Sequence, residues 1–361
     1  MSERLRVTYE LSPETDEAPR AKAEDIAYEQ TVELPPAATP AALNDWVPGE
    51  IEALEPIDNG RWQTIIAFHP SLAAGELTQT LNLIFGNISL KRGIRIKAVD
   101  WPSSLLRTLA GPRYGIQGWR ELTGVHDRAL AATALKPVGL SAASLAERAA
   151  AFARGGMDII KDDHGITDQA HAPFAERVPR CRDAVGDTSL YVPNVTAAWP
   201  LMIERAEQAR AAGCRAVLVS PMLTGLDAPR WLQAELGLTV MAHPSLTGGY
   251  LQPGHGFAPE ILLGDIFRLA GADAVIYPNT GSRFGLTPGE CEAINHQLRA
   301  DSGIAKPAMP TPAGGIDLAQ AGAWAHHYGL DTILLLGGSL YASGDIKTAT
   351  RDLIAAIGAQ P

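Results

Sequence analysis

The sequence predicts an α/β protein with two domains: an N-terminal ferredoxin-like α+β domain over residues 1–123 and a C-terminal (β/α)8 barrel over residues 124–361. Three observations favour this architecture. Strand and helix patterns are mixed in the first third of the chain, whereas they alternate strictly after about residue 130. The alternating part contains eight strand–helix units, the number that closes a parallel barrel. Most of the eight strand patterns end in polar residues or in paired glycines.

The N-terminal domain is predicted from a strand at Leu5–Leu11, in which apolar and polar residues alternate and Val7 and Tyr9 face inward. Further strands and two helices would complete a small α+β domain. The strand patterns are Ile51–Leu54, Trp62–Phe68 and Ile94–Val99, and the helical patterns are Ala21–Gln30 and Ala73–Phe85.

The barrel is predicted from short apolar segments that are mostly followed by segments of helical periodicity. The strand patterns cover residues 131–135, 157–160, 189–193, 215–220, 238–242, 273–277, 307–311 and 332–336. The helical patterns cover residues 143–154, 172–185, 198–212, 228–236, 259–270, 288–299, 317–328 and 345–358. An open, doubly wound sheet is the competing architecture. The count of eight units, and the absence of a Gly-x-Gly-x-x-Gly motif after the first strand, favour the barrel.

Composition limits what the chain is expected to bind. Its formal net charge is −10 and no basic run stands out, so nucleic-acid binding is not expected. No apolar run approaches the roughly 20 residues of a membrane helix, and the N-terminus lacks the apolar core of a signal peptide. Cys181, Cys214 and Cys291 are too widely spaced for a metal motif or a disulfide framework. We therefore expect a cytoplasmic protein that binds no membrane.

The second barrel strand ends in a charged run, Lys161-Asp162-Asp163-His164. Residues two apart share one face of a strand, so Lys161 and Asp163 should point the same way, with His164 following on the loop. Such side chains could hold a divalent cation. The alternative is a solvated strand end with a local Lys–Asp pair. Since barrel active sites lie where the strands end, the clustering of polar residues there favours a functional site.

Paired glycines follow the last two barrel strands, at residues 314–315 and 337–338. Glycines let the backbone approach an anion, and barrels often bind phosphate at these two loops. Gly315, Gly337 and Gly338 are therefore candidate phosphate contacts, with ordinary glycine turns as the alternative. Lys136 ends the first strand. Burial in a barrel mouth would make this lysine a usable acid or base, whereas the alternative is a side chain that extends into solvent.

Other polar residues at strand ends are candidate site residues. His243, at the end of the fifth strand, could shuttle a proton or bind a ligand, although a lone histidine there is often a satisfied core residue. Arg283 lies on a Gly-rich loop after the sixth strand and could contact an anionic substrate, with a surface arginine as the alternative. A polar rim around the site is expected from Asn194, Thr196, Asn279 and Ser339.

Several motifs spread over nearly the whole chain are similar to those of one family. The most specific is the glycine pair of residues 155–156, which leads through Asp158 into Lys161-Asp162-Asp163. The others are residues 27–32 (Ala-Tyr-Glu-Gln-Thr-Val), 85–87 (Phe-Gly-Asn), 111–116 (Gly-Pro-Arg-Tyr-Gly-Ile), 135–141 (Leu-Lys-Pro-Val-Gly-Leu-Ser), 314–316 (Gly-Gly-Ile) and 337–338 (Gly-Gly). In these motifs the chain resembles the ribulose-bisphosphate carboxylase (RuBisCO) large subunit, and specifically its relatives that do not fix CO2, the form IV RuBisCO-like proteins.

The resemblance implies a homodimer, or an assembly of dimers, whose sites lie between one barrel and the partner's N-terminal domain. It implies that Lys161 carries a CO2-derived carbamate and binds Mg2+ together with Asp163 and His164. Lys136 would be the acid–base lysine. The residues that reach over from the partner subunit would be Glu29 and Asn87.

Departures from the family narrow the expected reaction. His164 stands where the family has a glutamate ligand, and histidine is a poorer ligand for Mg2+ than a carboxylate. Val138 replaces a second lysine, and Pro244 replaces the arginine of a second phosphate site. Residues 281–285 contain no match for the mobile-loop lysine that handles CO2. A bisphosphate substrate and CO2 fixation are therefore not expected.

The remaining chemistry is formation of a metal-stabilised enolate from a monophosphorylated keto-sugar acid, catalysed by a lyase or isomerase. Decarboxylation or C–C cleavage of a 3-oxo-isoapionate-4-phosphate type of substrate is expected first, because the polar rim suits a hydroxylated acid better than a thiomethyl tail. The alternative activities are those of a 5-methylthioribulose-1-phosphate isomerase or a diketo-methylthiopentyl-1-phosphate enolase. A rival of another class is a non-catalytic protein that keeps the fold for binding.

Overall fold

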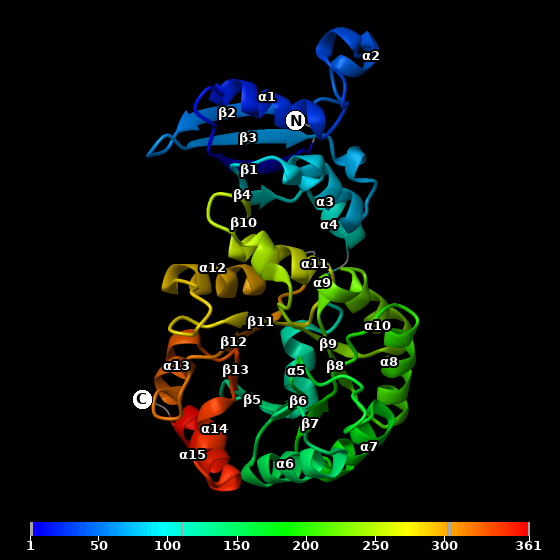
Figure 1. Cartoon of the computed structure of the whole chain (residues 1–361), viewed down its shortest axis with the longest axis vertical. Helices are drawn as coiled ribbons and strands as arrows, with labels where there is room; N and C mark the ends of the chain where they lie inside the picture. The colour runs from blue at the N-terminus through cyan, green and yellow to red at the C-terminus, as the bar shows by residue number, and fades with distance from the viewer. Residues whose placement is uncertain (1–2, 110, 302, 304, 360–361) are drawn as a thin grey trace. The chain divides into compact units, whose positions relative to one another are not determined.

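Two sheets organise the chain, which the computed structural model describes over residues 3–109, 111–301, 303 and 305–359. They belong to two compact units. One unit comprises Met1–Ala110, Thr247–Leu262 and Gly303–Ala305, and the other comprises Gly111–Leu246, Leu263–Ser302 and Lys306–Pro361. This division differs from the expected boundary after residue 123, because the segment from residue 111 packs with the barrel and an excursion from the barrel joins the N-terminal sheet (Figure 1).

The N-terminal unit contains a five-stranded sheet in the order β10-β4-β1-β3-β2. Without β10, this order and the helices after β1 and β3 make the ferredoxin-like arrangement that was predicted. The strands are β1 (Leu5–Leu11), β2 (Glu50–Pro56), β3 (Trp62–Phe68), β4 (Ile94–Asp100) and β10 (Gly256–Phe257). The helices are α1 (Pro19–Glu29), α2 (Ala41–Asn44), α3 (Leu77–Phe85) and α4 (Ser103–Leu109), with 3-10 turns at Pro36–Ala38, Pro70–Ala73, Asn87–Leu90 and Thr247–Tyr250.

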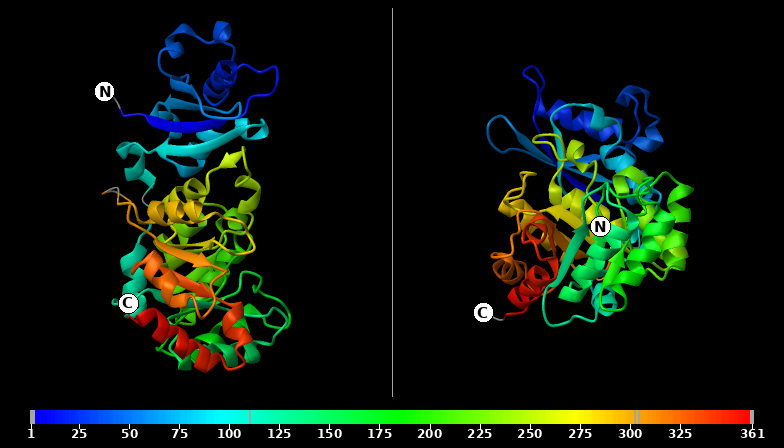
Figure 2. Two further views of the ribbon diagram at one scale, coloured as in Figure 1. Left: turned by 90° about the vertical axis from the view of Figure 1, so that its left-hand side faces the viewer. Right: turned by 60° about the horizontal axis from the view of Figure 1, so that its bottom comes forward.

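The alternation predicted for β1 is confirmed. Leu5, Val7, Tyr9 and Leu11 are fully buried on one face, and the Tyr9 hydroxyl donates to the Ile84 carbonyl at 2.8 Å, which ties the sheet to α3. β10 was not predicted. It pairs in parallel with β4 through only two residues, Gly256 opposite Arg95 and Phe257 opposite Ile96. Figure 2, left, shows this yellow-green segment next to the cyan β4.

The second unit is an eight-stranded parallel barrel in the order β7-β6-β5-β13-β12-β11-β9-β8. A bridge between Asn194 and Leu218 joins the two outer strands of this order, so the sheet closes on itself. The strands are β5 (Leu130–Leu135), β6 (Ile159–Asp162), β7 (Leu190–Val192), β8 (Ala216–Val219), β9 (Thr239–Ala242), β11 (Ala274–Pro278), β12 (Met309–Ala313) and β13 (Ile333–Leu336). All eight overlap the predicted strand segments, so the barrel prediction is confirmed.

Helices surround the barrel strands, as Figure 1 shows for α6, α7, α8 and α15. The barrel helices are α5 (Gly115–Thr123), α6 (Ala142–Gly155), α7 (Phe174–Val185), α8 (Leu201–Ala211), α9 (Pro221–Thr224), α10 (Ala228–Leu236), α11 (Phe267–Leu269), α12 (Pro288–Arg299), α13 (Ala321–Tyr328), α14 (Gly338–Ala342) and α15 (Ile346–Gly358). A π-helical segment, Glu260–Ile266, precedes α11. Within the described ranges, every helix is too short or too polar to span a lipid bilayer.

Two apolar clusters fill the barrel unit. The inner one lies inside the barrel at the starts of the strands, where Trp119 of α5 packs against Leu130, Ile159 and Met309. The outer one lies between the strands and the surrounding helices and includes Ala131. Because successive side chains of a strand point to opposite faces, membership of one cluster or the other shows which residues face the barrel interior.

Candidate active site

The strand alternation places four ionisable side chains on inward rows at the carboxyl ends of three strands. In β5, Ala132 belongs to the inner cluster and Leu135 to the outer one, so Lys136 follows on the inward row. In β6, Ile159 is inward, and Lys161 and then Asp163 continue that row. His243 also lies on an inward row, because Met241 of β9, two residues before it, belongs to the inner cluster.

These side chains meet at the barrel mouth. Lys136 Nζ lies 3.1 Å from Asp163 Oδ1, and His164 Nδ1 lies 3.5 Å from Asp163 Oδ2. The rings of His164 and His243 stack with their centroids 4.5 Å apart and their planes 14° apart. The structure therefore brings Lys136, Asp163, His164 and His243 together, although they come from three different strands and the loop after one of them.

Lys161 lies beneath this cluster and is 2% exposed. Its ammonium donates to the Asp162 carbonyl at 3.0 Å. The pKa of Lys161 is lowered to about 8, chiefly by burial; the charge of Asp163 opposes this shift and the charge of Lys136 adds to it. A substantial share of Lys161 is therefore a neutral amine near physiological pH.

The strand that carries Lys161 extends two residues beyond the predicted segment 157–160, and it therefore includes Asp162. Asp162 points to the helix side of the sheet, where it is fully buried. Its carboxylate accepts hydrogen bonds from the Tyr191 hydroxyl at 2.7 Å, the Asn194 backbone N–H at 3.0 Å and the Arg177 guanidinium at 3.1 Å. A buried strand end can tolerate this charge because every side of the carboxylate meets a donor.

Asp163 and His243 have opposite electrostatic surroundings. Burial disfavours the charged form of Asp163, but the hydrogen bond with His164 and the charges of Lys161 and Lys136 outweigh it and hold the carboxyl pKa far below its usual range. Burial, then the charge of Lys161, holds the pKa of His243 well below its usual range, so the ring is neutral. Its Nδ1 accepts from the Ser245 backbone N–H at 3.2 Å, which leaves the proton on Nε2 as a donor.

The glycine loops differ in the space around them. A side chain at Gly337 would meet Lys136 Cε at 3.9 Å, and one at Gly338 would meet nothing within 4 Å, so this loop opens beside Lys136. A side chain at Gly315 would instead come within 2.8 Å of the Ser282 backbone nitrogen, because the loop after β11 covers it. The structure thus places Gly337 next to Lys136, with open space at Gly338.

The two asparagines of the expected polar rim do not line the mouth, and this interpretation is wrong for them. Asn194 is fully buried and donates both amide hydrogens to backbone carbonyls, of His164 and of Ile166, each at 3.0 Å. Asn279 is also fully buried and accepts a hydrogen bond from the Tyr328 hydroxyl. The Thr196 hydroxyl accepts from the Ser220 N–H. The Asn194 amide is therefore paired within the fold, whereas Asn279 Nδ2 is buried without a partner among the described residues.

The remaining predicted residues lie elsewhere. Arg283 is exposed, with its guanidinium 5.0 Å from the centre of the Phe284 ring. In the N-terminal unit, Asn87 Nδ2 donates to Glu29 Oε1 at 3.2 Å and to Glu33 Oε1 at 2.6 Å. Glu29 and Asn87 are therefore in contact, as a shared role in one site would require.

Tyr341 of α14 was missed by the sequence analysis. Its hydroxyl accepts from the Lys136 backbone N–H at 3.0 Å and donates to the Ala134 carbonyl at 2.9 Å. It thereby joins the helix that follows Gly337 and Gly338 to the strand end that carries Lys136. Nothing in the local sequence signals this contact, because more than 200 residues separate its partners.

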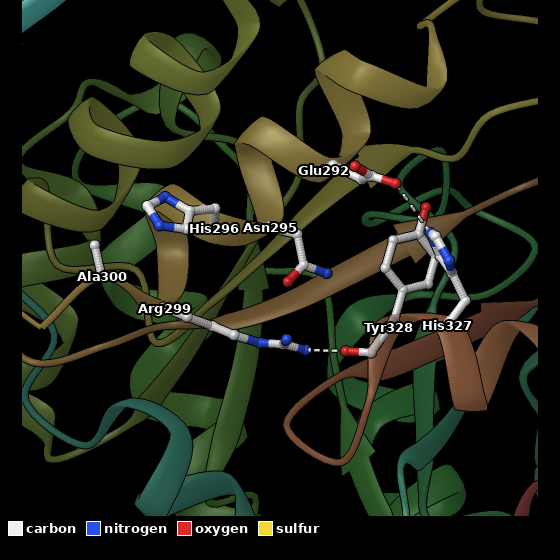
Figure 3. A pocket seen from close by; sticks show the side chains of 7 residues that line it. All are labelled: Glu292, Asn295, His296, Arg299, Ala300, His327 and Tyr328. Carbon is white, nitrogen blue, oxygen red and sulfur yellow. Dashed lines mark hydrogen bonds and ion pairs between the residues drawn. The ribbon is translucent and has the colours of Figure 1, made fainter.

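Two cavities of the barrel unit lie away from these residues. One, of about 340 Å³, lies between α12 and α13, where His327 contacts Glu292 and Arg299 donates to the Tyr328 carbonyl (Figure 3). The other, of about 530 Å³, lies near the strand starts and is lined in part by Tyr114 and Arg215. Neither contains the titratable cluster, so the chemistry of the strand ends defines the candidate site.

The donor set at the mouth is incomplete for a metal ion as it stands. Among the described residues, no group of three His, Cys, Asp or Glu side chains is arranged to hold a metal. Asp163 and His164 supply one carboxylate and one imidazole. A neutral Lys161 could add CO2 to form a carbamate, whose two oxygens would complete a set of hard donors. The residues therefore fit a divalent cation once Lys161 is carbamylated.

Comparison with known proteins agrees with the site. Residues 115–350 match the model of the ribulose bisphosphate carboxylase large chain, catalytic domain. Ribulose bisphosphate carboxylase-like protein 1 of Rhodopseudomonas palustris is 40% identical over 96% of this chain and 95% of its own length. The 5-methylthioribulose-1-phosphate isomerase of Rhodospirillum rubrum is 36% identical over 96% and 94% of the two chains.

Solved structures show the same relationship. The Rubisco-like protein from Rhodopseudomonas palustris superposes with a TM-score of 0.88 at 35% identity, over 99% of this chain and 98% of that one. The rubisco-like protein MtnW from Alicyclobacillus acidocaldarius gives a TM-score of 0.88 at 28% identity, over 98% and 93%. The chain belongs to the RuBisCO large-chain family, in its branch of RuBisCO-like enzymes that do not fix CO2.

Proposed function

We propose that this enzyme isomerises a monophosphorylated ketose through an enediolate, with 5-methylthioribulose 1-phosphate as the first substrate to test. The observation that carries the proposal is the contact cluster of Lys136, Asp163, His164 and His243 beside the open Gly337 loop. It combines a proton carrier, a neutral N–H donor and a place for one phosphate, which are the groups that this reaction requires.

The reaction moves two protons. A base removes a proton from the hydroxyl-bearing carbon beside the ketone, the electron pair forms a carbon–carbon double bond, and the carbonyl oxygen takes the negative charge. Transfer of the neighbouring hydroxyl proton to that oxygen and return of a proton to the former carbonyl carbon complete an isomerisation. Lys136 is the proposed proton carrier, because its ammonium is within 3.1 Å of Asp163 and its side chain is 43% exposed at the mouth.

His243 is the proposed electrophile. A neutral imidazole with its proton on Nε2 can donate to the developing oxyanion without first being charged, and its tautomer is already fixed by Ser245. Lys161 as a carbamate, with Asp163 and His164, would hold a divalent cation, which would supply positive charge to the enediolate oxygens. Asp163 stays ionised across the neutral pH range, as both its ion pair with Lys136 and its proposed role as a cation ligand require.

The phosphate is proposed to lie against Gly337 and Gly338. As the first residues of α14, Gly338 and Ser339 have backbone N–H groups without acceptors inside the helix. Gly315 and Arg283 remain candidate contacts of the same group. The sequence offers one such loop beside the base, which suits a monophosphate better than a bisphosphate.

Apolar groups around the mouth favour a thiomethyl tail over a hydroxylated acid. A side chain at Gly165 would come within 3.3 Å of Val138 and 3.6 Å of Asp163, so Val138 lies beside the reacting groups. Leu246 and Phe284, on the loops after β9 and β11, are each 63% exposed. With both rim asparagines buried, the argument that placed decarboxylation of a sugar acid first no longer holds.

The names of the relatives support an enolate reaction. Besides the isomerase of Rhodospirillum rubrum, a protein of Shouchella clausii is named a putative 2,3-diketo-5-methylthiopentyl-1-phosphate enolase and is 31% identical over 81% of each chain. Both names describe a methylthio sugar phosphate whose carbonyl activates the neighbouring carbon. The proposal applies this common chemistry to the present chain.

The test is an assay in D2O with Mg2+ and bicarbonate, followed by 31P and 1H NMR. Conversion of 5-methylthioribulose 1-phosphate to an isomer that carries one solvent deuteron is expected, and Lys136→Ala should lose it. CO2 release from a keto-sugar acid phosphate, with no conversion of the methylthio sugar, would show that the enzyme is a decarboxylase and not an isomerase. No turnover of either substrate, with no rise in Tm on adding either, would contradict the proposal.

A further inference from the structure

The loop after β6 carries two groups of the site at its start, Asp163 and His164. One backbone hydrogen bond, from Ile166 N–H to the Asp163 carbonyl at 3.0 Å, closes a turn there. Further along, the Gln169 side chain donates to the Gly165 carbonyl at 2.7 Å. The carbonyls of His164 and Ile166 are instead bonded from outside the loop.

Asn194 contacts this loop at two points. Its Nδ2 donates to the carbonyls of His164 and Ile166, both at 3.0 Å. Its Oδ1 accepts from the Thr196 N–H at 3.1 Å, and its own backbone N–H donates to Asp162 at 3.0 Å. The side chain is fully buried and each of its polar atoms is paired, so it has no hydrogen left to donate to a substrate.

The other end of the loop is fixed by a buried ion pair. Arg177 and Asp162 are both fully buried and lie 3.1 Å apart. Arg177 also donates to the Thr167 and Ala172 carbonyls, both at 2.7 Å. Asn194 thus holds the start of the segment from residue 163 to residue 172, and Arg177 holds its later part.

The position of Asn194 in the barrel makes it a rigid support. It forms the bridge to Leu218 that closes the barrel between β7 and β8, and flanking backbone hydrogen bonds reinforce it. A side chain anchored at this seam can hold two loop carbonyls in place at small cost in entropy, since its own conformation is already fixed.

We propose that Asn194 is a positioning residue, which holds the loop so that the Asp163 carboxylate and the His164 ring face the barrel mouth. Its effect on turnover rests on the proposed function, whereas its effect on the loop does not. Replacing it should act on the reacting groups of the loop and leave the phosphate site on α14 unaffected.

Two variants and one control test this in the full-length protein. Asn194→Ala removes both donors, and Asn194→Ser keeps a single short donor in case the alanine variant folds poorly. Ser189→Ala is the matched control, because the Ser189 hydroxyl donates to the Met157 carbonyl at 2.6 Å and so also joins β7 to the residues before β6, but at the far end of the strands. Hydrogen exchange is followed by mass spectrometry in peptides that cover residues 160–172 and 128–136.

Asn194→Ala should raise exchange in peptide 160–172 well above wild type while peptide 128–136 changes little. Its kcat should fall by about 10- to 100-fold, the usual effect of removing a hydrogen bond behind a reacting group, with KM within about threefold. Asn194→Ser should give a smaller change of the same kind, and Ser189→Ala should lower Tm without either effect.

Unchanged exchange in peptide 160–172 in both Asn194 variants would overturn the proposal. Equal increases in both peptides would also overturn it, because they would show a general loss of stability. If the wild-type protein turns over no sugar phosphate, the proposed function fails, but the exchange comparison still decides whether Asn194 holds the loop.

Discussion

Lys161 and Asp162 are adjacent in the chain, but strand alternation gives them opposite surroundings. Asp162 meets three donors behind the sheet, whereas Lys161 enters the barrel, where among the described residues its ammonium donates to the Asp162 carbonyl alone, at 3.0 Å. A buried charge without a close counter-ion shifts its pKa toward the neutral form, and that is the direction for Lys161. The same burial that weakens the ammonium makes the amine available to CO2 or to a proton.

Lys161→Met should reveal this shift as a change in the pH dependence of stability. The folded-state pKa is about 8, below the ordinary lysine value of 10.5, so the unfolded chain binds more protons between these pH values. The free energy of unfolding of the wild type should therefore rise relative to that of Lys161→Met from about pH 8 upward, by at most about 1.4 kcal/mol per pH unit. Urea unfolding of both proteins at pH 7.5, 8.5 and 9.5, in CO2-free buffer with a chelator, measures it. A constant difference would contradict the shifted pKa.

Gly337→Asp should weaken substrate binding by placing a negative charge where the phosphate is proposed to lie. We expect KM to rise by at least about tenfold, equivalent to 1.4 kcal/mol, with a smaller change in kcat. The same substitution at Gly289 of α12, which faces open space, is the control. Steady-state kinetics on the two variants test this prediction, and equal KM values would indicate that the phosphate binds at another loop.

Among the elements, the strands of the barrel were predictable because their apolar runs directly reflect burial on both faces. The inward positions of Lys161, Asp163 and His243 follow because alternate residues of a strand share one face. Helix α5 was not, because its start depends on a distant residue: the Asp273 carboxylate accepts from the N–H groups of Tyr114 and Gly115, each at 2.8 Å. Such a cap leaves no local signal.

Local backbone geometry explains other differences. The helix predicted over Ala73–Phe85 is interrupted at its start, because Ala74 and Gly75 adopt left-handed conformations with φ of 52° and 73°. β10 and α14 are too short for any periodic pattern. Asn194 was assigned to the substrate because the sequence shows that an amide is present but not that its hydrogens are already bonded.

Trp119→Ala tests the role of α5 as the element that fills the barrel at the strand starts. The indole is fully buried in the inner cluster, and its loss should reduce the free energy of unfolding by about 3–5 kcal/mol. Trp119→Phe, which keeps most of the volume, should cost less. Urea unfolding measures both variants. A cost below about 1 kcal/mol for the alanine variant would show that α5 is not part of the core.

At the scale of the whole molecule, the predicted site residues are divided between the two units. Glu29 and Asn87 pair in the N-terminal unit, and Lys136, Asp163, His164 and His243 gather in the barrel. The resemblance predicted that a second copy of the chain brings the two groups together. In a two-fold dimer such an arrangement creates two equivalent sites, each built from both chains.

Mixing Lys136→Ala and Glu29→Ala chains separates shared sites from sites within one chain. If each site combines one barrel with the partner's N-terminal unit, a mixed dimer has one intact site and one doubly altered site. Random exchange makes half of the dimers mixed, so about a quarter of wild-type activity should return from two inactive parents. Native mass spectrometry verifies the mixed dimers. Lys136→Ala mixed with Lys161→Ala is the control and should recover nothing, because both changes lie in the barrel and every site then has one. Recovery in neither mixture would place Glu29 in the same site as the Lys136 of its own chain, whereas an active Glu29→Ala parent would place Glu29 outside the site.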